Sequence, residues 1–185
     1  TYILQRPEGH LVDVHVTAAD GKVTVNAGDK ADVTLLDMDG KTIGTASGEK
    51  TEIKVENPVL WNAEKPYVYT VKLEKDGEVI EIETGFCKIE ISSTCQLLIN
   101  GNSVKLHGVN HHDTHPTKGW CETNEELEKE LRLMKKLNIN CIRTSHYPPT
   151  PRFVELCDEL GFYVMLETDI ETHGLIYIGD WSLLT

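Results

Sequence analysis

The sequence has few cationic side chains, no long apolar run and few aromatic residues. Lys and Arg total 18 against 30 Asp and Glu, so the formal charge is −12. Proteins that bind the phosphate backbone need a basic patch, and nucleic acid is therefore not expected as a partner. The longest apolar run covers residues 162–166, whereas a membrane-spanning helix needs about 20 such residues, so no membrane partner is expected. An uncharged substrate such as a sugar is compatible with this balance.

Cysteines are few, and no two of them form a C-x-x-C pair. The five are Cys87, Cys95, Cys121, Cys141 and Cys157. We expect free thiols, several of them buried as small apolar side chains, which favours a reducing compartment. No signal peptide is visible, so a cytoplasmic location is expected. A periplasmic or secreted location stays open, since a signal could precede Thr1.

Residues 10–91 carry the pattern of short β-strands, and residues 1–9 are expected to be the tail of a preceding domain. Apolar and polar side chains alternate, and turn dipeptides such as Asp-Gly separate the runs. The expected strands are 10–17, 22–25, 32–36, 51–55, 67–73 and 78–84. About seven short strands in such a length are typical of an immunoglobulin-like sandwich, although the Cys–Trp–Cys pattern of true immunoglobulins is missing.

The pattern changes after Cys95 to strands that alternate with helices. Residues 96–109 indicate a hairpin around Asn100-Gly101. Thr123 and Glu126 then form a capping box that predicts a helix. Its apolar stripe would consist of Leu127, Leu131, Met134 and Leu137.

A strand is expected at residues 140–144, and Thr150-Pro151 predicts the start of a second helix that ends at Gly161. The inner face of this helix would carry Phe153, Leu156, Cys157 and Leu160. Residues 162–166 form a third, nearly all-apolar strand, which we expect to be covered on both faces. The β-α-β-α-β order implies parallel strands, as in the start of a (β/α)₈ TIM barrel or half of a doubly wound sheet. A closed barrel needs about 250 residues, so residues 92–185 would hold only its N-terminal part.

Three polar clusters follow the three expected parallel strands, at residues 110–116, 143–148 and 167–174. The carboxyl ends of parallel strands meet at one edge of a sheet, where the sites of such folds lie. Histidine and arginine can hydrogen-bond hydroxyl groups, and a carboxylate can hold a cation or stabilise positive charge. The sequence therefore predicts a site at this edge.

The histidines of these clusters have other interpretations. His111, His112 and His115 could lie on a solvated loop, or could ligate zinc, although their spacing matches no helical H-E-x-x-H pattern. Ser145-His146 could be a nucleophile and its base, but adjacent side chains on an extended chain point apart, and no G-x-S-x-G motif is present.

The carboxylates of the third cluster alternate along the chain. Glu167, Asp169 and Glu171 would share one face of an extended segment. They would repel one another unless a cation or shifted pKa values relieve them, and a solvated loop is the alternative. Trp61 is expected to pack in the sandwich and not to form a sugar platform.

Residues 140–161, NCIRTSHYPPTPRFVELCDELG, resemble the signature of glycoside hydrolase family 2. Residues 108–116, GVNHHDTHP, and residues 169–174, DIETHG, narrow the resemblance towards the β-galactosidases of that family. Residues 60–69, LWNAEKPYVY, resemble the segment that precedes the barrel. The resemblance covers nearly the whole chain and is most specific from residue 97 to residue 174.

The resemblance implies part of a homo-oligomeric retaining enzyme that hydrolyses terminal non-reducing β-D-galactose residues. His112 and His146 match histidines that bind the galactosyl unit and stabilise the transition state, and Arg143 matches an arginine beside them. Glu171 and His173 match two ligands of a magnesium ion.

The sequence departs from the family pattern at two positions. An arginine commonly stands in place of His111, and a Gly-Phe-Arg stretch in place of Gly85-Phe86-Cys87. The second departure puts one buried polar contact in doubt.

The resemblance also implies that the catalytic carboxylates are missing from these 185 residues. A retaining glycosidase needs two carboxylates about 5 Å apart, and the family places its acid/base in an Asn-Glu motif, whereas Asn124-Glu125 begins a helix. We expect both carboxylates beyond Thr185, so the chain itself should be inactive, bind magnesium weakly and self-associate through an open barrel edge. Another activity of the family, β-glucuronidase or β-mannosidase, stays open, as does a non-catalytic carbohydrate-binding or interaction module.

Overall fold

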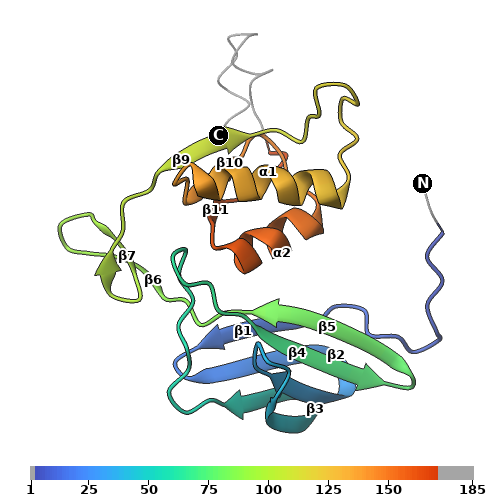
Figure 1. The fold of residues 1–185 in the computed structure, drawn as a ribbon. Helices are drawn as coiled ribbons and strands as arrows, with labels where there is room; N and C mark the ends of the chain where they lie inside the picture. The colour runs from blue at the N-terminus through green and yellow to red at the C-terminus, as the bar shows by residue number, and fades with distance from the viewer. Residues whose placement is uncertain (1–2, 171–185) are drawn as a thin grey trace, which may run out of the picture.

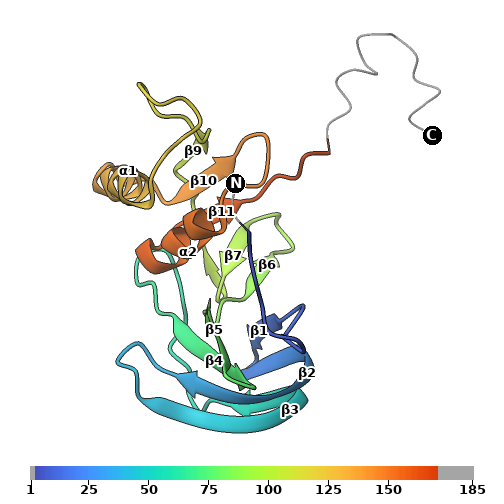
Figure 2. The same ribbon diagram turned by 90° about the vertical axis from the view of Figure 1, so that its right-hand side faces the viewer.

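A computed structural model describes residues 3–170 of the chain, and it contains two larger regions (Figure 1). A small three-stranded sheet lies between them (Figure 2). The first region is an antiparallel sheet. Its strands are β1 (His15–Ala19), β2 (Lys22–Leu36), β3 (Thr42–Lys54), β4 (Tyr69–Lys75) and β5 (Glu78–Thr84). The expected β-rich character of this part is confirmed.

The long strand β2 organises this sheet. It pairs with β3 along its whole length, and its other edge pairs with β1 at the start and with β4 at the end. A register shift between Asn26 and Ala31 interrupts the β2–β3 ladder, where Gly28 has a φ of +71°. Such a bulge bends a strand and increases its twist. One buried core therefore collects residues from both ends of β2, among them Val23, Val25, Val33 and Leu35.

The sheet differs in detail from the strands predicted from the sequence. Residues 27–29 are a bulge within β2 and not a turn between two strands. β3 begins at Thr42, well before the strand predicted at 51–55. The sequence did not indicate its first half, because that half is rich in Gly, Thr and Ala and lacks the apolar alternation of a half-buried strand. Residues 10–14 form no strand, since the backbone N–H of Leu11 donates to the Glu78 carboxylate instead of a neighbouring strand. The five strands form one continuous hydrogen-bonded sheet. An immunoglobulin-like sandwich consists of two packed sheets, so it stays a prediction.

A small sheet follows, with strands β6 (Ile89–Ile91), β7 (Leu97–Ile99) and β8 (Asn102–Ser103). The turn predicted at Asn100-Gly101 joins β7 to β8, and both turn residues have positive φ, as a type I′ hairpin requires. The second arm ends at Ser103, earlier than predicted.

The second region has the expected β-α-β-α-β order. Its elements are β9 (Gly108–His111), α1 (Asn124–Lys136), β10 (Cys141–Thr144), α2 (Pro151–Leu160) and β11 (Tyr163–Met165). The strands are parallel, with β10 between β9 and β11. Both helices lie on the same side of the sheet (Figure 2), where Val109, Ile142 and Val164 pack against them.

Local signals set the ends of both helices. Thr123 Oγ1 accepts a hydrogen bond from Glu126 N, and Thr123 N donates one to the Glu126 carboxylate, which confirms the capping box. Gly161 ends α2 with a φ of +82°. Thr150 occupies the N-cap position of α2, with its backbone extended and Pro151 following. Leu137 is 65% exposed, so its predicted place on the buried stripe was wrong. The reason is that α1 ends at Lys136, and Leu137 is already the C-cap residue.

Trp61 joins the two regions. It is 6% exposed, its indole N–H donates to the carbonyl of Asp158 at 2.8 Å, and its ring meets Tyr163 edge to face at 5.7 Å. Trp61 is thus buried, but against the second region and not within the core of the first sheet, where the sequence had placed it. β11, in contrast, is less covered than expected. Met165 and Leu166 are 53% and 58% exposed, and among the described residues β11 pairs with β10 alone.

All five cysteines, which lie in the described part, are free thiols, and Cys141 and Cys157 are buried, as predicted. Burial raises the pKa of both thiols. Among residues 3–170, no helix is long and apolar enough to cross a membrane.

Candidate functional site

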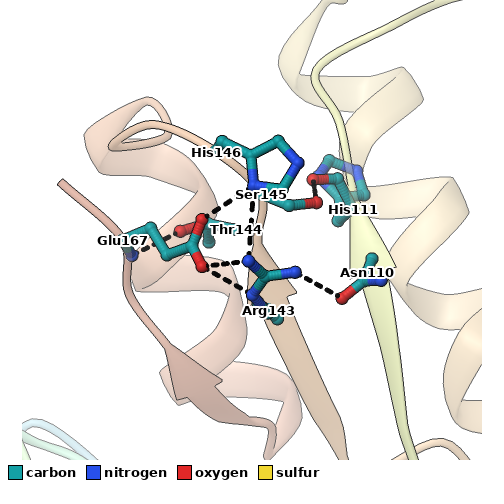
Figure 3. Close-up of polar contacts among 7 residues, drawn as sticks. All are labelled: Asn110, His111, Arg143, Thr144, Ser145, His146 and Glu167. Atoms are coloured by element: carbon teal, nitrogen blue, oxygen red, sulfur yellow. Dashed lines mark hydrogen bonds and ion pairs between the residues drawn. The ribbon is translucent and has the colours of Figure 1, made fainter. Parts of the chain in front are cut away.

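The carboxyl ends of β9, β10 and β11 bring the first residues of all three polar clusters together (Figure 3). In the sheet, Arg143 lies opposite Asn110 on one neighbour and Met165 on the other. Arg143 and Asn110 thus share the face opposite the helices, which in a (β/α)₈ fold is the barrel interior. We call the four side chains Asn110, Arg143, His146 and Glu167 the polar edge.

Arg143 is the centre of the polar edge. Its Nε donates to Glu167 Oε1 at 2.5 Å, and a second guanidinium nitrogen makes an ion pair with the same oxygen. Its Nη1 donates to Asn110 Oδ1 at 3.3 Å. Two contacts between one guanidinium and one carboxylate fix the orientation of both groups. Arg143 is therefore held in place from both neighbouring strands.

His146 extends the polar edge towards solvent. Its Nδ1 lies 3.1 Å from Glu167 Oε2 and 3.3 Å from Arg143 Nη2, and its side chain is 54% exposed. Partial desolvation alone would raise the pKa of Glu167, but hydrogen bonds with Arg143 and His146 lower it. Glu167 is thus a carboxylate at neutral pH, paired with Arg143.

Aromatic rings flank His146. The His112 ring meets the His146 ring at 5.6 Å with an interplanar angle of 72°, and Tyr147 lies 6.1 Å from His112. Trp120 stacks near Tyr147 at 5.5 Å and is 70% exposed. His112 and His146, both predicted site residues, are therefore neighbours. Trp120 was missed, because it lies in a loop that carries no strand or helix pattern.

Ser145 does not act as an exposed nucleophile. It is 1% exposed, and its hydroxyl donates to the carbonyl of His111 at 3.2 Å. Thr144 is also buried, and its Oγ1 accepts a hydrogen bond from the backbone N–H of Glu167 at 3.0 Å. The Ser145-His146 nucleophile–base alternative is therefore wrong, and both hydroxyls instead fix the chain around Arg143.

The three histidines of the first cluster have separate environments. His111 is 4% exposed and packs against the Phe153 ring at 4.9 Å, so it is not on a solvated loop. His112 is exposed beside His146. His115 faces Glu126, with 3.4 Å between Nε2 and Oε1. The interpretation of these three as a joint zinc site is wrong, because their side chains point to different partners.

The predicted magnesium ligands Glu171 and His173 lie outside the described residues. Of the predicted site residues, the structure brings together Arg143, His112 and His146, and it adds Glu167 and Asn110 to them.

Two family models match consecutive parts of the chain. The model "Glycosyl hydrolases family 2" matches residues 7–86, and "Glycosyl hydrolases family 2, TIM barrel domain" matches residues 89–183. The second match begins at residue 89, where the small sheet starts.

Curated relatives carry the name beta-galactosidase. The protein of Staphylococcus xylosus is 43% identical over 143 residues, which are 77% of this chain and 14% of that protein. That of Actinobacillus pleuropneumoniae is 46% identical over 140 residues, 76% of this chain and 14% of that protein. That of Arthrobacter sp. (strain B7) is 38% identical and covers 96% of this chain and 18% of that protein. The chain thus spans less than a fifth of the length of these three relatives.

Similar solved structures carry the name beta-glucuronidase. That of Faecalibacterium prausnitzii has a TM-score of 0.79 and 31% identity, covering 86% of this chain and 28% of that chain. That of Dictyoglomus thermophilum has a TM-score of 0.73 and 26% identity, covering 84% of this chain and 28% of that chain.

Proposed function

Since this chain belongs to glycoside hydrolase family 2, we propose that it is part of a retaining β-galactosidase that hydrolyses terminal non-reducing β-D-galactose residues. The observation that carries this proposal is the polar edge, where Arg143, His146 and Glu167 converge at the carboxyl ends of parallel strands. Sites of parallel α/β folds lie at that edge. The names of the curated relatives support galactose as the sugar.

The charge of the polar edge favours an uncharged sugar. Arg143 contacts Glu167 through two guanidinium nitrogens, so its charge is already neutralised by a carboxylate. A glucuronide carries its own carboxylate and would need a cation that is free to pair with it. β-Glucuronidase is the second candidate, because the similar solved structures have that name.

In the proposed enzyme, His112 and His146 bind sugar hydroxyls. Their rings lie 5.6 Å apart, and both side chains are exposed at the same edge. A donor that is held in place before the reaction stabilises developing charge better than one that must reorient. Glu167 supplies that restraint for His146 through its contact with Nδ1 at 3.1 Å.

The chemistry itself needs two carboxylates about 5 Å apart, an acid/base and a nucleophile. Glu167 is engaged by Arg143 and His146 and is therefore a positioning residue in this proposal. We further propose that Glu171 and His173 contribute to a magnesium site, which would supply electrostatic stabilisation in the complete enzyme. We expect the 185-residue chain alone to release no chromophore from a nitrophenyl β-galactoside.

A substrate panel on the full-length protein tests the proposal. Rates are compared for nitrophenyl β-D-galactoside, β-D-glucuronide and β-D-mannoside at equal enzyme concentration. We expect kcat/KM for the galactoside to exceed the others by about 100-fold or more, since a site that leaves a buried charge unpaired rejects a substrate strongly. A higher kcat/KM for the glucuronide would overturn the galactosidase assignment, and no turnover of any glycoside would favour the non-catalytic module.

A further inference from the structure

The side chain of His111 has an unsatisfied nitrogen inside the protein. The residue is 4% exposed, and its Nε2 has no hydrogen-bond partner among the described residues. Buried polar atoms are nearly always paired, because an unpaired one loses its contact with water and gains nothing in return. Nε2 has an ion-pair neighbour, Glu130, but no well-formed hydrogen bond, which leaves it free to bind a further ligand.

Carboxylates surround this imidazole. Nε2 lies 3.5 Å from Glu130 Oε2, and Nδ1 lies 3.6 Å from Asp113 Oδ1. Glu122 completes a group with His111 and Glu130, in which one ligand atom from each residue lies within 4.8 Å of the others. Ligand atoms of a tetrahedral zinc ion are each about 2.1 Å from the metal and so roughly 3.4 Å from one another, which small side-chain rotations would achieve here.

We propose that His111 Nε2 and the carboxylates of Glu122 and Glu130 bind a divalent transition-metal ion, for which Zn²⁺ is the best fit. One nitrogen and two carboxylate ligands with a water as the fourth suit zinc. Magnesium is disfavoured, because it prefers oxygen ligands in octahedral geometry. Asp113 faces the other ring nitrogen, where a carboxylate orients a metal-bound histidine and increases its basicity.

In the absence of the ion, the neighbouring carboxylates favour the protonated form of the imidazole. Burial lowers the pKa of His111, but Glu130, Asp113 and Glu122 outweigh it, and the net pKa is raised. Burial, followed by repulsion from Glu130, raises the pKa of Glu122. The group thus attracts positive charge at its centre, and a metal ion must displace the proton from Nε2.

The ion would join the end of β9 to the start and the interior of α1. His111 ends β9, Glu122 precedes α1, and Glu130 lies within α1. The carbonyl of His111 also accepts the hydrogen bond from Ser145, next to His146 of the polar edge. The proposed ion is therefore a structural metal ion next to the polar edge. Its ligands differ from the proposed magnesium ligands, and its binding does not depend on which sugar the enzyme cleaves.

Isothermal titration of the chelator-treated 185-residue chain with ZnCl₂ tests the proposal, with MgCl₂ as the comparison. We expect one Zn²⁺ per chain with a micromolar Kd, a higher thermal unfolding temperature with zinc, and affinity that falls from pH 7.5 to pH 5.5 as protons compete for Nε2. No saturable zinc binding, or equal binding of magnesium, would overturn it.

Matched variants locate the ion. His111→Arg keeps a positive charge among the carboxylates but removes the ligand, and Glu122→Gln removes one oxygen ligand with little change of shape. Both should weaken zinc binding at least tenfold, with circular dichroism verifying that they fold. Glu128→Gln on the same helix and His115→Gln on the same loop should bind as the unaltered chain does. Unchanged binding by His111→Arg, or loss of binding by His115→Gln, would contradict the proposed site.

Discussion

The two regions differ in where they keep their polar groups. The antiparallel sheet of β1–β5 has a large apolar core, and among residues 3–170 Thr51 is the one polar residue buried in it. The parallel region has a smaller core, yet it buries His111, Thr144 and Ser145. Burying a polar group costs free energy unless it is hydrogen-bonded. These groups lie at the carboxyl ends of β9 and β10. Hydrogen bonds offset the cost for Thr144 and Ser145 but not for His111 Nε2, so buried polarity is concentrated at the edge that carries the candidate site.

The largest expected effect on stability comes from removing a side chain from either of the two hydrophobic cores. Leu73→Ala in β4 and Phe153→Ala in α2 each remove a fully buried side chain, which costs about 2–5 kcal/mol of unfolding free energy. Phe153 also packs against His111, so only its loss should disturb the polar edge. Urea denaturation gives the free energies, and hydrogen exchange shows which region loses protection.

Val79→Ala is the control for this pair, because Val79 is 52% exposed in β5 and surface changes usually stay within about 0.5 kcal/mol. Equal loss of protection in both regions from Leu73→Ala would show that the regions unfold as one unit, and the comparison between them would then fail.

The second prediction concerns the junction. Burial, with a smaller contribution from Glu159, raises the pKa of Asp158 from 3.8 to about 6. Because the folded state holds this proton more tightly, the associated stability is fully present below pH 3.8 and is lost as pH rises to about 6. Asp158→Asn should therefore stabilise the chain at pH 7 by roughly 1–3 kcal/mol.

The gain from Asp158→Asn should vanish near pH 3.5, and the contact from Trp61 should persist because it uses the Asp158 carbonyl. Urea denaturation at both pH values measures it, with Asp39→Asn in an exposed turn as the control. A gain of equal size at both pH values would show that the buried charge is not its cause.

A smaller effect is expected at the start of α1. Thr123→Ala removes the hydrogen bond to Glu126 N, which should cost about 1 kcal/mol, while Thr123→Ser keeps the hydroxyl and should cost little. Chemical denaturation measures both. If the two regions unfold independently, hydrogen exchange should increase in the parallel region, which contains α1, and stay unchanged in the antiparallel sheet of β1–β5.

Local features were predictable from the sequence, because a few neighbouring residues determine them. The capping box at Thr123, the turn at Asn100-Gly101 and the C-cap at Gly161 are of this kind. The meeting of Arg143 with the third cluster followed from a general rule, that parallel strands end at one edge. Arg143 and Glu167 are 24 residues apart in the sequence, and their contact is a consequence of that rule.

Other features depended on contacts that no local pattern reveals. The bulge at Gly28 lies between the part of β2 that pairs with β1 and the part that pairs with β4. The burial of His111 depends on Phe153, and its carboxylate neighbours come from a loop and a helix. The position of Glu130 was the one sequence signal of this group, since a carboxylate next to the buried Leu127 and Leu131 of α1 indicates a polar partner inside the protein.

The central claim is that the polar edge binds the sugar, and a pair of histidines in the full-length enzyme tests it directly. His146 lies at the carboxyl edge, whereas His107 is exposed just before β9, at the opposite end of the sheet. The measurement is kcat/KM for nitrophenyl β-D-galactoside in His146→Ala and His107→Ala. We predict a loss of about 100-fold or more for His146→Ala, as for other preorganised donors, and less than a twofold change for His107→Ala. Similar values for the two variants would contradict the claim.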